Sequence, residues 1–191
     1  MGIESTKSRA LAESRGLLQA FGYNGFSFQH IANALGINKA SLYTHFESKE
    51  DLGKDLIEDF RKAFAEWTET VSVFEPDAQI GALFEVFFKF ASDSKKVCPL
   101  SAMVGEFNSL PTGMKGDLKE LYEARQSWLK KVIKRGQSQK IFRKDKSAAE
   151  LASLVLAMGL GAQFMARVSG EPHLVREIKM RALEVLNLDQ K

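Results

Sequence analysis

Apolar residues recur three and four positions apart along most of the chain, a spacing typical of amphipathic helices. Strands would instead show alternating β-branched residues bounded by turn pairs, and no segment has that pattern. The four prolines, at positions 76, 99, 111 and 172, fall where the helical spacing lapses, so they separate helices. The pattern predicts an all-α fold.

Nine helices are expected, and several have recognisable ends. Ser27 and Asn38 are favourable N-cap residues, while Gly22 and Gly36 are favourable C-cap residues. The apolar stripe of the fifth helix is so wide that this helix should lie at the centre of its domain. The predicted helices cover residues 6–21, 27–35, 39–46, 48–73, a segment around 80–91, 99–110, 111–141, 147–168 and 172–188.

Residues 27–46 combine a helix, a tight turn and a second short helix, which is how a helix-turn-helix is built. Leu42 and Phe46 are four residues apart and should face the core. The outward positions then hold small or hydrogen-bonding side chains that suit a DNA groove: Lys39, Ala40, Tyr43 and Thr44. Two short helices around a glycine also occur in helical domains that bind no DNA, so the spacing alone leaves both interpretations open.

Composition excludes several classes of protein. Hydrophobic residues make up 45% of the chain and charged residues 27%, which is ordinary for a folded domain, and a net charge of +3 permits an anionic partner without requiring one. The only cysteine, Cys98, rules out an internal disulfide and a cysteine-rich zinc cluster. With no basic segment leading into an apolar one and no run of 18 apolar residues, we expect a cytoplasmic protein that does not enter the membrane.

The residues in and around the helix-turn-helix follow a specific order: Phe21-Gly22-Tyr23, Ser27, Ile31-Ala32, Leu35-Gly36-Ile37, Lys39-Ala40-Ser41-Leu42-Tyr43, His45-Phe46 and Ser48-Lys49-Glu50-Asp51-Leu52. This order resembles the signature of the TetR family of transcriptional regulators over residues 9–56. The chain departs from that signature at Ser14 and Gly16, where the family favours alanine, and at Phe28, where a smaller residue is usual. The rest of the chain resembles the family in helix number and length.

The resemblance implies a DNA-binding domain at residues 1–47 and a ligand-binding and dimerisation domain at residues 48–191, joined by the helix at 48–73. It implies a homodimeric regulator, usually a repressor, that a small apolar or aromatic effector releases from a near-palindromic double-stranded operator. It places Lys39, Ala40, Ser41 and Thr44 against base edges, together with Phe28 and Gln29, and it places Tyr43, His45 and Lys49 on phosphates. Ser27 is also expected to be a DNA-binding residue.

Two further sites are expected in the C-terminal domain. Aromatic residues at helical spacing are more often core than pocket, but those that could line an effector site are Phe64, Trp67, Phe87, Phe88, Phe107, Trp128 and Phe164, with Met103. The dimer interface is expected to use Leu151, Val155, Met158, Ala162, Met165 and Ile178, with Gly159 and Gly161 allowing close approach of a partner helix.

Some residues have competing interpretations. Cys98 follows Lys95 and Lys96, which would favour a thiolate sensor if they fold over it, although an unreactive thiol is the simpler interpretation. Glu106 is a lone acid on an apolar segment, either exposed or orienting a ligand. Three histidines without paired spacing predict no metal site, and no phosphate loop or catalytic grouping suggests an enzyme or a cofactor. The alternative function is a helical small-molecule-binding or protein-interaction module whose DNA-binding head does not function.

Overall fold

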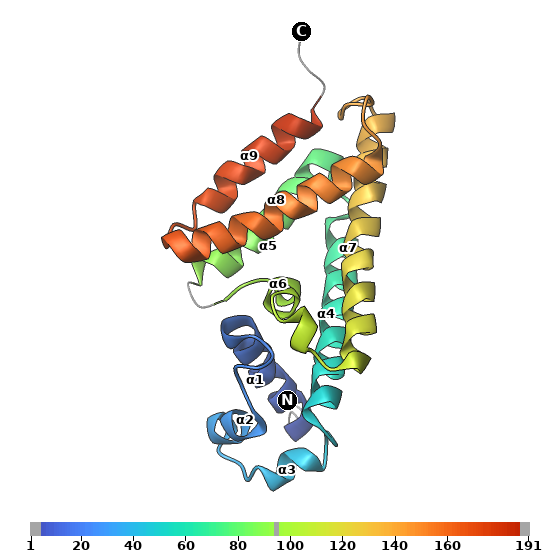
Figure 1. Ribbon diagram of the computed structural model, residues 1–191. Coiled ribbons are helices and arrows are strands. Elements are labelled where there is room, and N and C mark those ends of the chain that lie inside the picture. Colours follow the sequence, from blue (N-terminus) through green and yellow to red (C-terminus); the bar gives the residue numbers. More distant parts are fainter. Residues whose placement is uncertain (1–4, 94–95, 188–191) are drawn as a thin grey trace. The chain divides into compact units, whose positions relative to one another are not determined.

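The computed structural model describes residues 5–93 and 96–187, and within them it confirms the all-α prediction (Figure 1). These residues form nine α-helices and one short 3₁₀ helix, η1. Their bounds are α1 Thr6–Phe21, α2 Phe28–Leu35, α3 Ala40–Tyr43, α4 Lys49–Val71, α5 Pro76–Ser92, α6 Pro99–Val104, η1 Phe107–Ser109, α7 Thr112–Ser138, α8 Ala148–Ser169 and α9 Leu174–Leu186.

The helices form two compact units. The first unit contains the chain up to Lys62 together with Pro99–Leu121, and the second contains Ala63–Cys98 together with Tyr122–Lys191. The chain therefore crosses between the units within α4, at the Cys98–Pro99 bond and within α7. The helix-turn-helix thus folds together with α6, η1 and the first turns of α7.

In the first unit, α1 packs against α2, α3 and α6. Ser5 caps α1, because its hydroxyl oxygen accepts a hydrogen bond from the Ser8 N–H at 3.2 Å. Gly22 ends α1 with a φ of 78°, a backbone conformation that favours glycine. The fully buried apolar side chains of this unit include Ala10, Leu18, Ile31, Leu42, Leu52, Leu56, Leu100 and Met103.

In the second unit, α5 packs against both α8 and α9, and these two helices pack against each other (Figure 1). Phe84 and Phe87 of α5 are buried, which fits the wide apolar stripe of this helix. Glu85 joins α5 to α9 through ion pairs with Lys179 at 2.7 Å and Arg176 at 3.1 Å. The hydrogen bond from Lys179 is the main cause that lowers the pKa of Glu85.

Several predicted helix ends differ from the structure, and the helix expected to reach residue 46 ends at Tyr43. The helix expected at 99–110 stops at Val104 and resumes as η1, with the chain turning at Gly105 and Glu106. The helix expected to reach residue 141 stops at Ser138, because the amides of Ile141 and Phe142 both bond back to the carbonyl of Gly136.

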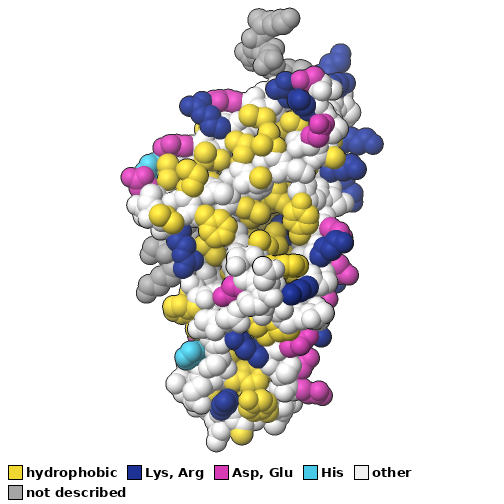
Figure 2. Space-filling model, in the orientation of Figure 1, with side chains coloured by type: hydrophobic (Ala, Val, Ile, Leu, Met, Phe, Trp, Pro, Cys, Tyr) yellow, Lys and Arg dark blue, Asp and Glu magenta, His cyan; other side chains and the backbone are white. Residues whose placement is uncertain are grey.

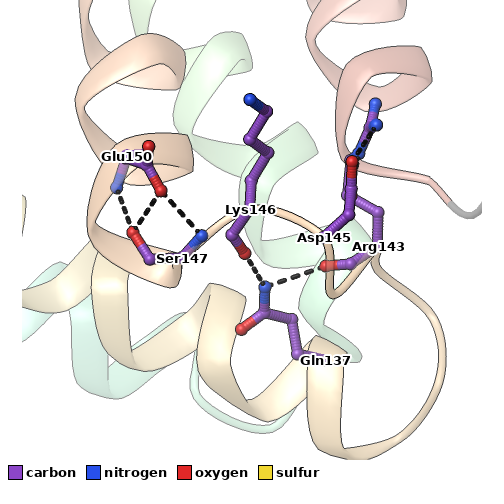
Figure 3. Close-up of polar contacts among 6 residues, drawn as sticks. All are labelled: Gln137, Arg143, Asp145, Lys146, Ser147 and Glu150. Carbon is purple, nitrogen blue, oxygen red and sulfur yellow. Dashed lines mark hydrogen bonds and ion pairs between the residues drawn. The ribbon is translucent and has the colours of Figure 1, made fainter.

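The connection between α7 and α8 is held by side chains that bond to backbone groups (Figure 3). The Gln137 amide donates to the carbonyls of Arg143 at 2.8 Å and Lys146 at 2.9 Å. Ser147 and Glu150 then form a capping box at the start of α8. These bonds satisfy carbonyls that lie outside regular helix, so the turn is well defined.

Gly159 of α8 provides a test of the packing in the second unit. A Cβ added there would lie 2.3 Å from the buried Phe87 ring, whereas a Cβ at Gly81 of α5 would meet nothing within 4 Å. We expect Gly159→Ala to lower the free energy of unfolding by about 1–3 kcal/mol through overpacking. Gly81→Ala should raise it by up to about 1 kcal/mol through helix propensity. Urea denaturation of both variants measures this, and equal effects would contradict the packing described.

Candidate nucleic-acid interface

Backbone geometry determines where α2 ends and where α3 begins in the helix-turn-helix. Gly36 ends α2 in the left-handed conformation, with a φ of 65°, and the Ile37 amide bonds back to the Ala32 carbonyl at 3.0 Å. The Asn38 side-chain oxygen accepts a hydrogen bond from the Ala40 N–H at 2.9 Å, while the N-cap position of α3 is occupied by Lys39. Gly36 therefore has the role that the sequence predicts, whereas Asn38, the predicted N-cap residue, lies one residue before the observed N-cap position.

The inner surface of this motif is apolar and closed to solvent. Ile31, Ala32 and Leu42 are fully buried, and Phe46 is nearly so. Phe28 is only 5% exposed, and its ring lies edge-on to Tyr43 with the centroids 5.0 Å apart. The predicted contact of Phe28 with DNA bases is therefore wrong, because its ring supports Tyr43 from inside the domain.

The other face of α3 and its flanks point to solvent. Lys39, Ala40, Tyr43, Thr44 and His45 are exposed, and Ser41 is half-buried. On α2, Gln29 is exposed and donates to Asn33, whereas Ser27 is half-buried and takes part in the cap of α2. Every predicted base-contacting residue except Phe28 thus has an accessible side chain.

The basic residues of α1 already form ion pairs or hydrogen bonds within the domain. Lys7 pairs with Asp55 at 2.8 Å and Arg15 with Asp59 at 2.5 Å, while Arg9 donates to the Leu35 carbonyl. Lys39 lies over the Tyr43 ring, 5.9 Å from its centroid, and pairs with no carboxylate among the described residues. Lys39 is therefore a cation of this motif that an anionic partner can reach.

Lys49 does not have the predicted role. Its ammonium donates to the carbonyls of Tyr23 at 2.6 Å and Phe26 at 2.5 Å, and it lies over both rings at 4.5 and 4.7 Å. Burial lowers the pKa of Lys49, and the nearby Glu106 carboxylate opposes that shift. With its donors used inside the domain, Lys49 is a structural residue and not a phosphate contact.

Known proteins share this arrangement. The family model for bacterial regulatory proteins of the TetR family matches residues 10–56, and the model for the tetracycline-repressor-like C-terminal domain matches residues 76–181. The second match alone spans more than half of the chain. The chain belongs to the TetR family.

Individual relatives agree with this assignment. The transcriptional repressor DhaR from Mycobacterium sp. (strain GP1) is 28% identical over 148 residues, which cover 74% of this chain and 72% of DhaR. A TetR regulator from Legionella pneumophila is 28% identical with a TM-score of 0.89, covering 98% of this chain and all of that one. A TetR-family regulator from Agrobacterium tumefaciens is 26% identical with a TM-score of 0.89, covering 95% of this chain and 97% of its own. The protein is thus a TetR-family transcriptional regulator with a DNA-binding helix-turn-helix.

The second unit brings together three of the residues predicted to line an effector site. Phe64, Trp67 and Trp128 form an aromatic cluster whose ring centroids are 5.1–5.9 Å apart. The buried Arg125 guanidinium lies 4.8 Å from the Phe64 ring. Trp128 also lines a surface pocket of about 320 Å³ that includes Lys131. Sequence reasoning found the three rings but not this cation, since a lone arginine on a helix has no distinguishing spacing.

The other predicted effector residues are dispersed. Phe87 is buried against Gly159, and the Phe88 ring is covered by the Arg176 guanidinium at 3.6 Å. Phe164 is exposed on α8. Met103 and Phe107 belong to the first unit, where Met103 is fully buried and Phe107 is exposed with Lys115 over its ring. The structure therefore groups only three of the eight predicted residues.

The dimer-interface prediction for α8 is wrong at its centre. Leu151, Val155 and Ala162 are buried within the unit, and Gly159 faces Phe87 instead of a partner helix. Met165 is 54% exposed, and Met158 and Ile178 are half-buried. These four buried positions line the inner face of α8, so they are closed to a second copy.

The opposite face of α8 is also apolar. Its exposed and half-buried residues are Leu154, Ala157, Met158, Gly161, Phe164, Met165 and Val168, and we call them the α8 outer stripe. Figure 2 shows hydrophobic side chains gathered over this region. The helix is long and apolar enough to cross a membrane by length and composition, with 44% of its most apolar window buried. The exposed apolar surface of α8 therefore includes Met158 and Met165 of the predicted interface but not Leu151, Val155 or Ala162.

Cys98 is buried, and only 2% of the residue's surface is exposed. Its backbone N–H donates to the Gln163 side-chain oxygen at 2.8 Å. Of the two lysines expected to activate the thiol, Lys96 pairs with Asp93 at 2.8 Å, and Lys95 falls outside the described residues. These contacts favour the unreactive thiol over the sensor. Within residues 5–93 and 96–187, no three His, Cys, Asp or Glu side chains are placed to hold a metal ion.

Replacement of Lys49 distinguishes its structural role from a phosphate contact. We expect Lys49→Met to lower the free energy of unfolding by about 1–3 kcal/mol, because two carbonyls lose a charged donor. Lys62→Met, at an exposed position of the same helix, should change it by less than about 0.5 kcal/mol. Urea denaturation measures both values. An unchanged stability with a flatter salt dependence of DNA binding would restore the phosphate role.

Proposed function

We propose that this protein is a homodimeric, cytoplasmic transcriptional repressor that binds a near-palindromic operator and is released from it by a small apolar or aromatic molecule. The exposed face of α3 carries this proposal. Leu42 and Phe46 hold α3 against the domain, and Lys39, Ala40 and Thr44 are left on the accessible side. A lysine can donate to guanine O6 and N7, and the alanine or threonine methyl group can contact a thymine methyl.

Repression is supported by the similarity to DhaR, which is named a transcriptional repressor. Dimerisation is supported by the α8 outer stripe, since the sequence from Leu151 to Ala166 contains no charged residue. A two-fold axis through such a face makes the same stripe meet itself. Two recognition helices would then lie about one DNA turn, or roughly 34–36 Å, apart.

An effector site is supported by the aromatic cluster in the second unit. Phe64 and Trp67 lie on α4, the same continuous helix that carries Lys49 in the first unit. A ligand that repacks these rings acts on a helix that also supports the DNA-binding head. By linkage, operator DNA must then weaken the binding of that ligand by the same factor.

Selection from a random-sequence duplex pool tests operator binding directly. We expect the wild-type protein to enrich a near-palindromic sequence. Lys39→Ala should cost about 1–3 kcal/mol on the enriched duplex and relax preference at one position in each half-site. Fluorescence anisotropy on the enriched duplex and on a scrambled one measures this. Equal losses on the two duplexes would remove Lys39 from base recognition, and failure to enrich any sequence would favour the module with a non-functional head.

A charge placed in the α8 outer stripe tests dimerisation. Met165→Glu should convert the protein to a monomer, because each copy would bury an unpaired carboxylate in an apolar interface. Val73→Glu replaces a residue that is 81% exposed in the same unit and should leave the dimer intact. Sedimentation velocity gives the mass of each variant. If the Met165→Glu protein remained dimeric, the dimer interface would have to lie outside the α8 outer stripe.

A further inference from the structure

Glu106 contacts the turn between α1 and α2, although 82 residues separate it from Asn24 in that turn. Its carboxylate accepts a hydrogen bond from the Asn24 backbone N–H at 3.0 Å. The Asn24 side-chain amide in turn donates to the Ser109 hydroxyl at 2.9 Å, and that hydroxyl donates to the Glu106 carbonyl at 2.9 Å. The end of α6 and η1 thus hold Asn24 by its backbone and by its side chain. All of these residues belong to the first unit.

Gly22 makes room for the Glu106 carboxylate. A Cβ at Gly22 would lie 2.6 Å from a carboxylate oxygen of Glu106, which is closer than such atoms approach. The backbone of Gly22, with φ 78° and ψ 176°, is in a region that only glycine adopts without strain. The positive φ favours glycine here by itself, and the missing side chain leaves the space that the Glu106 carboxylate occupies.

Lys49 also holds the same turn. The Lys49 ammonium donates hydrogen bonds to the carbonyls of Tyr23 and Phe26. The Glu106 carboxylate accepts a hydrogen bond from the N–H of Asn24, which lies between them in the sequence. A carboxylate on an amide and an ammonium on two carbonyls are charge-assisted bonds, which are stronger than neutral ones. The turn from Gly22 to Ser27 is therefore fixed by two oppositely charged side chains.

The position of the turn determines the position of α2. Phe26 is buried, and α2 begins two residues later at Phe28, whose ring supports Tyr43 on α3. Recognition requires the side chains of α3 to reach base edges within hydrogen-bonding distance. A turn free to shift would spread the orientations of α3 and weaken binding without removing any DNA contact.

We propose that Glu106 is a positioning residue for operator binding, which acts by fixing the α1–α2 turn and hence the presentation of α3. The segment that follows α6 is then a functional part of the DNA-binding head, although it lies far from the helix-turn-helix in sequence. The inference rests on the proposed function, because it requires that α3 bind DNA.

The test compares three variants with the wild-type protein on a duplex selected by the wild type from a random-sequence pool. Glu106→Ala removes the acceptor, Glu106→Gln keeps an oxygen that can accept from Asn24, and Asn108→Ala changes an exposed neighbour in η1 whose side chain has no hydrogen bond among the described residues. Anisotropy titrations well below the melting temperature, at several salt concentrations, give affinity and salt slope. Hydrogen exchange of the Asn24 amide reports the turn itself.

We expect Glu106→Ala to weaken binding about tenfold, as for the loss of a charge-assisted hydrogen bond in each head, with an unchanged salt slope because no phosphate contact is lost. The Asn24 amide should exchange faster in this variant. Glu106→Gln should stay within about twofold of the wild type, and Asn108→Ala should match it. If Glu106→Ala does not fold, Glu106→Asp, which withdraws the carboxylate by one methylene, should show the same loss.

Several results would overturn the inference. A Glu106→Ala protein with wild-type affinity and a lower melting temperature would make Glu106 a stability residue only. A loss of affinity that Glu106→Gln does not rescue would show that binding does not depend on the hydrogen bond to Asn24. If the wild-type protein selects no duplex, the proposed function fails, and the positioning role fails with it.

Discussion

The burial of Leu42 and Phe46 is the constraint on which the DNA-binding face depends. Leu42 lies in α3 and Phe46 lies three residues beyond its end, with the Phe46 N–H bonded back to the Leu42 carbonyl at 3.0 Å, so the two buried side chains fix which residues of α3 face outward. Lys39 and Thr44 are exposed for this reason and not because of any contact of their own. The buried Phe28 ring supports Tyr43 by packing edge-on to it. A change in the inner face would therefore alter the outer face without touching it.

Local features of the sequence predicted most of the fold. Gly22 and Gly36 ended helices where expected because a left-handed or extended glycine conformation is a property of a few adjacent residues. The roles of Lys49 and Glu106 could not be predicted in the same way. Each depends on backbone groups of the α1–α2 turn that lie 23–82 residues away, and a backbone carbonyl or N–H has no sequence identity.

The two faces of α8 illustrate a different limit. Hydrophobic periodicity identifies an inner face only when the other face is polar. From Leu151 to Ala166 both faces are apolar, so the pattern could not show that Val155 packs inside the unit while Met165 remains exposed. Gly159 could be placed only by the structure, where the Phe87 ring occupies the space that a side chain would fill. Because the inner face of α8 is already covered within the unit, its apolar outer face can be removed from water only by contact with another molecule.

The short segment from Cys98 to Glu106 has a long-range hydrogen bond at each end. At Cys98 the backbone N–H is held by Gln163 of α8 in the second unit, and at Glu106 the carboxylate holds Asn24 in the first. Gln163 is buried on the helix whose other face forms the outer stripe. The two contacts share one chemistry, a side-chain oxygen that accepts from a backbone N–H, and they join positions 65 and 82 residues apart in the sequence. Neither donor N–H belongs to a side chain that a sequence pattern could identify, so only the folded chain shows that both ends of this segment are fixed.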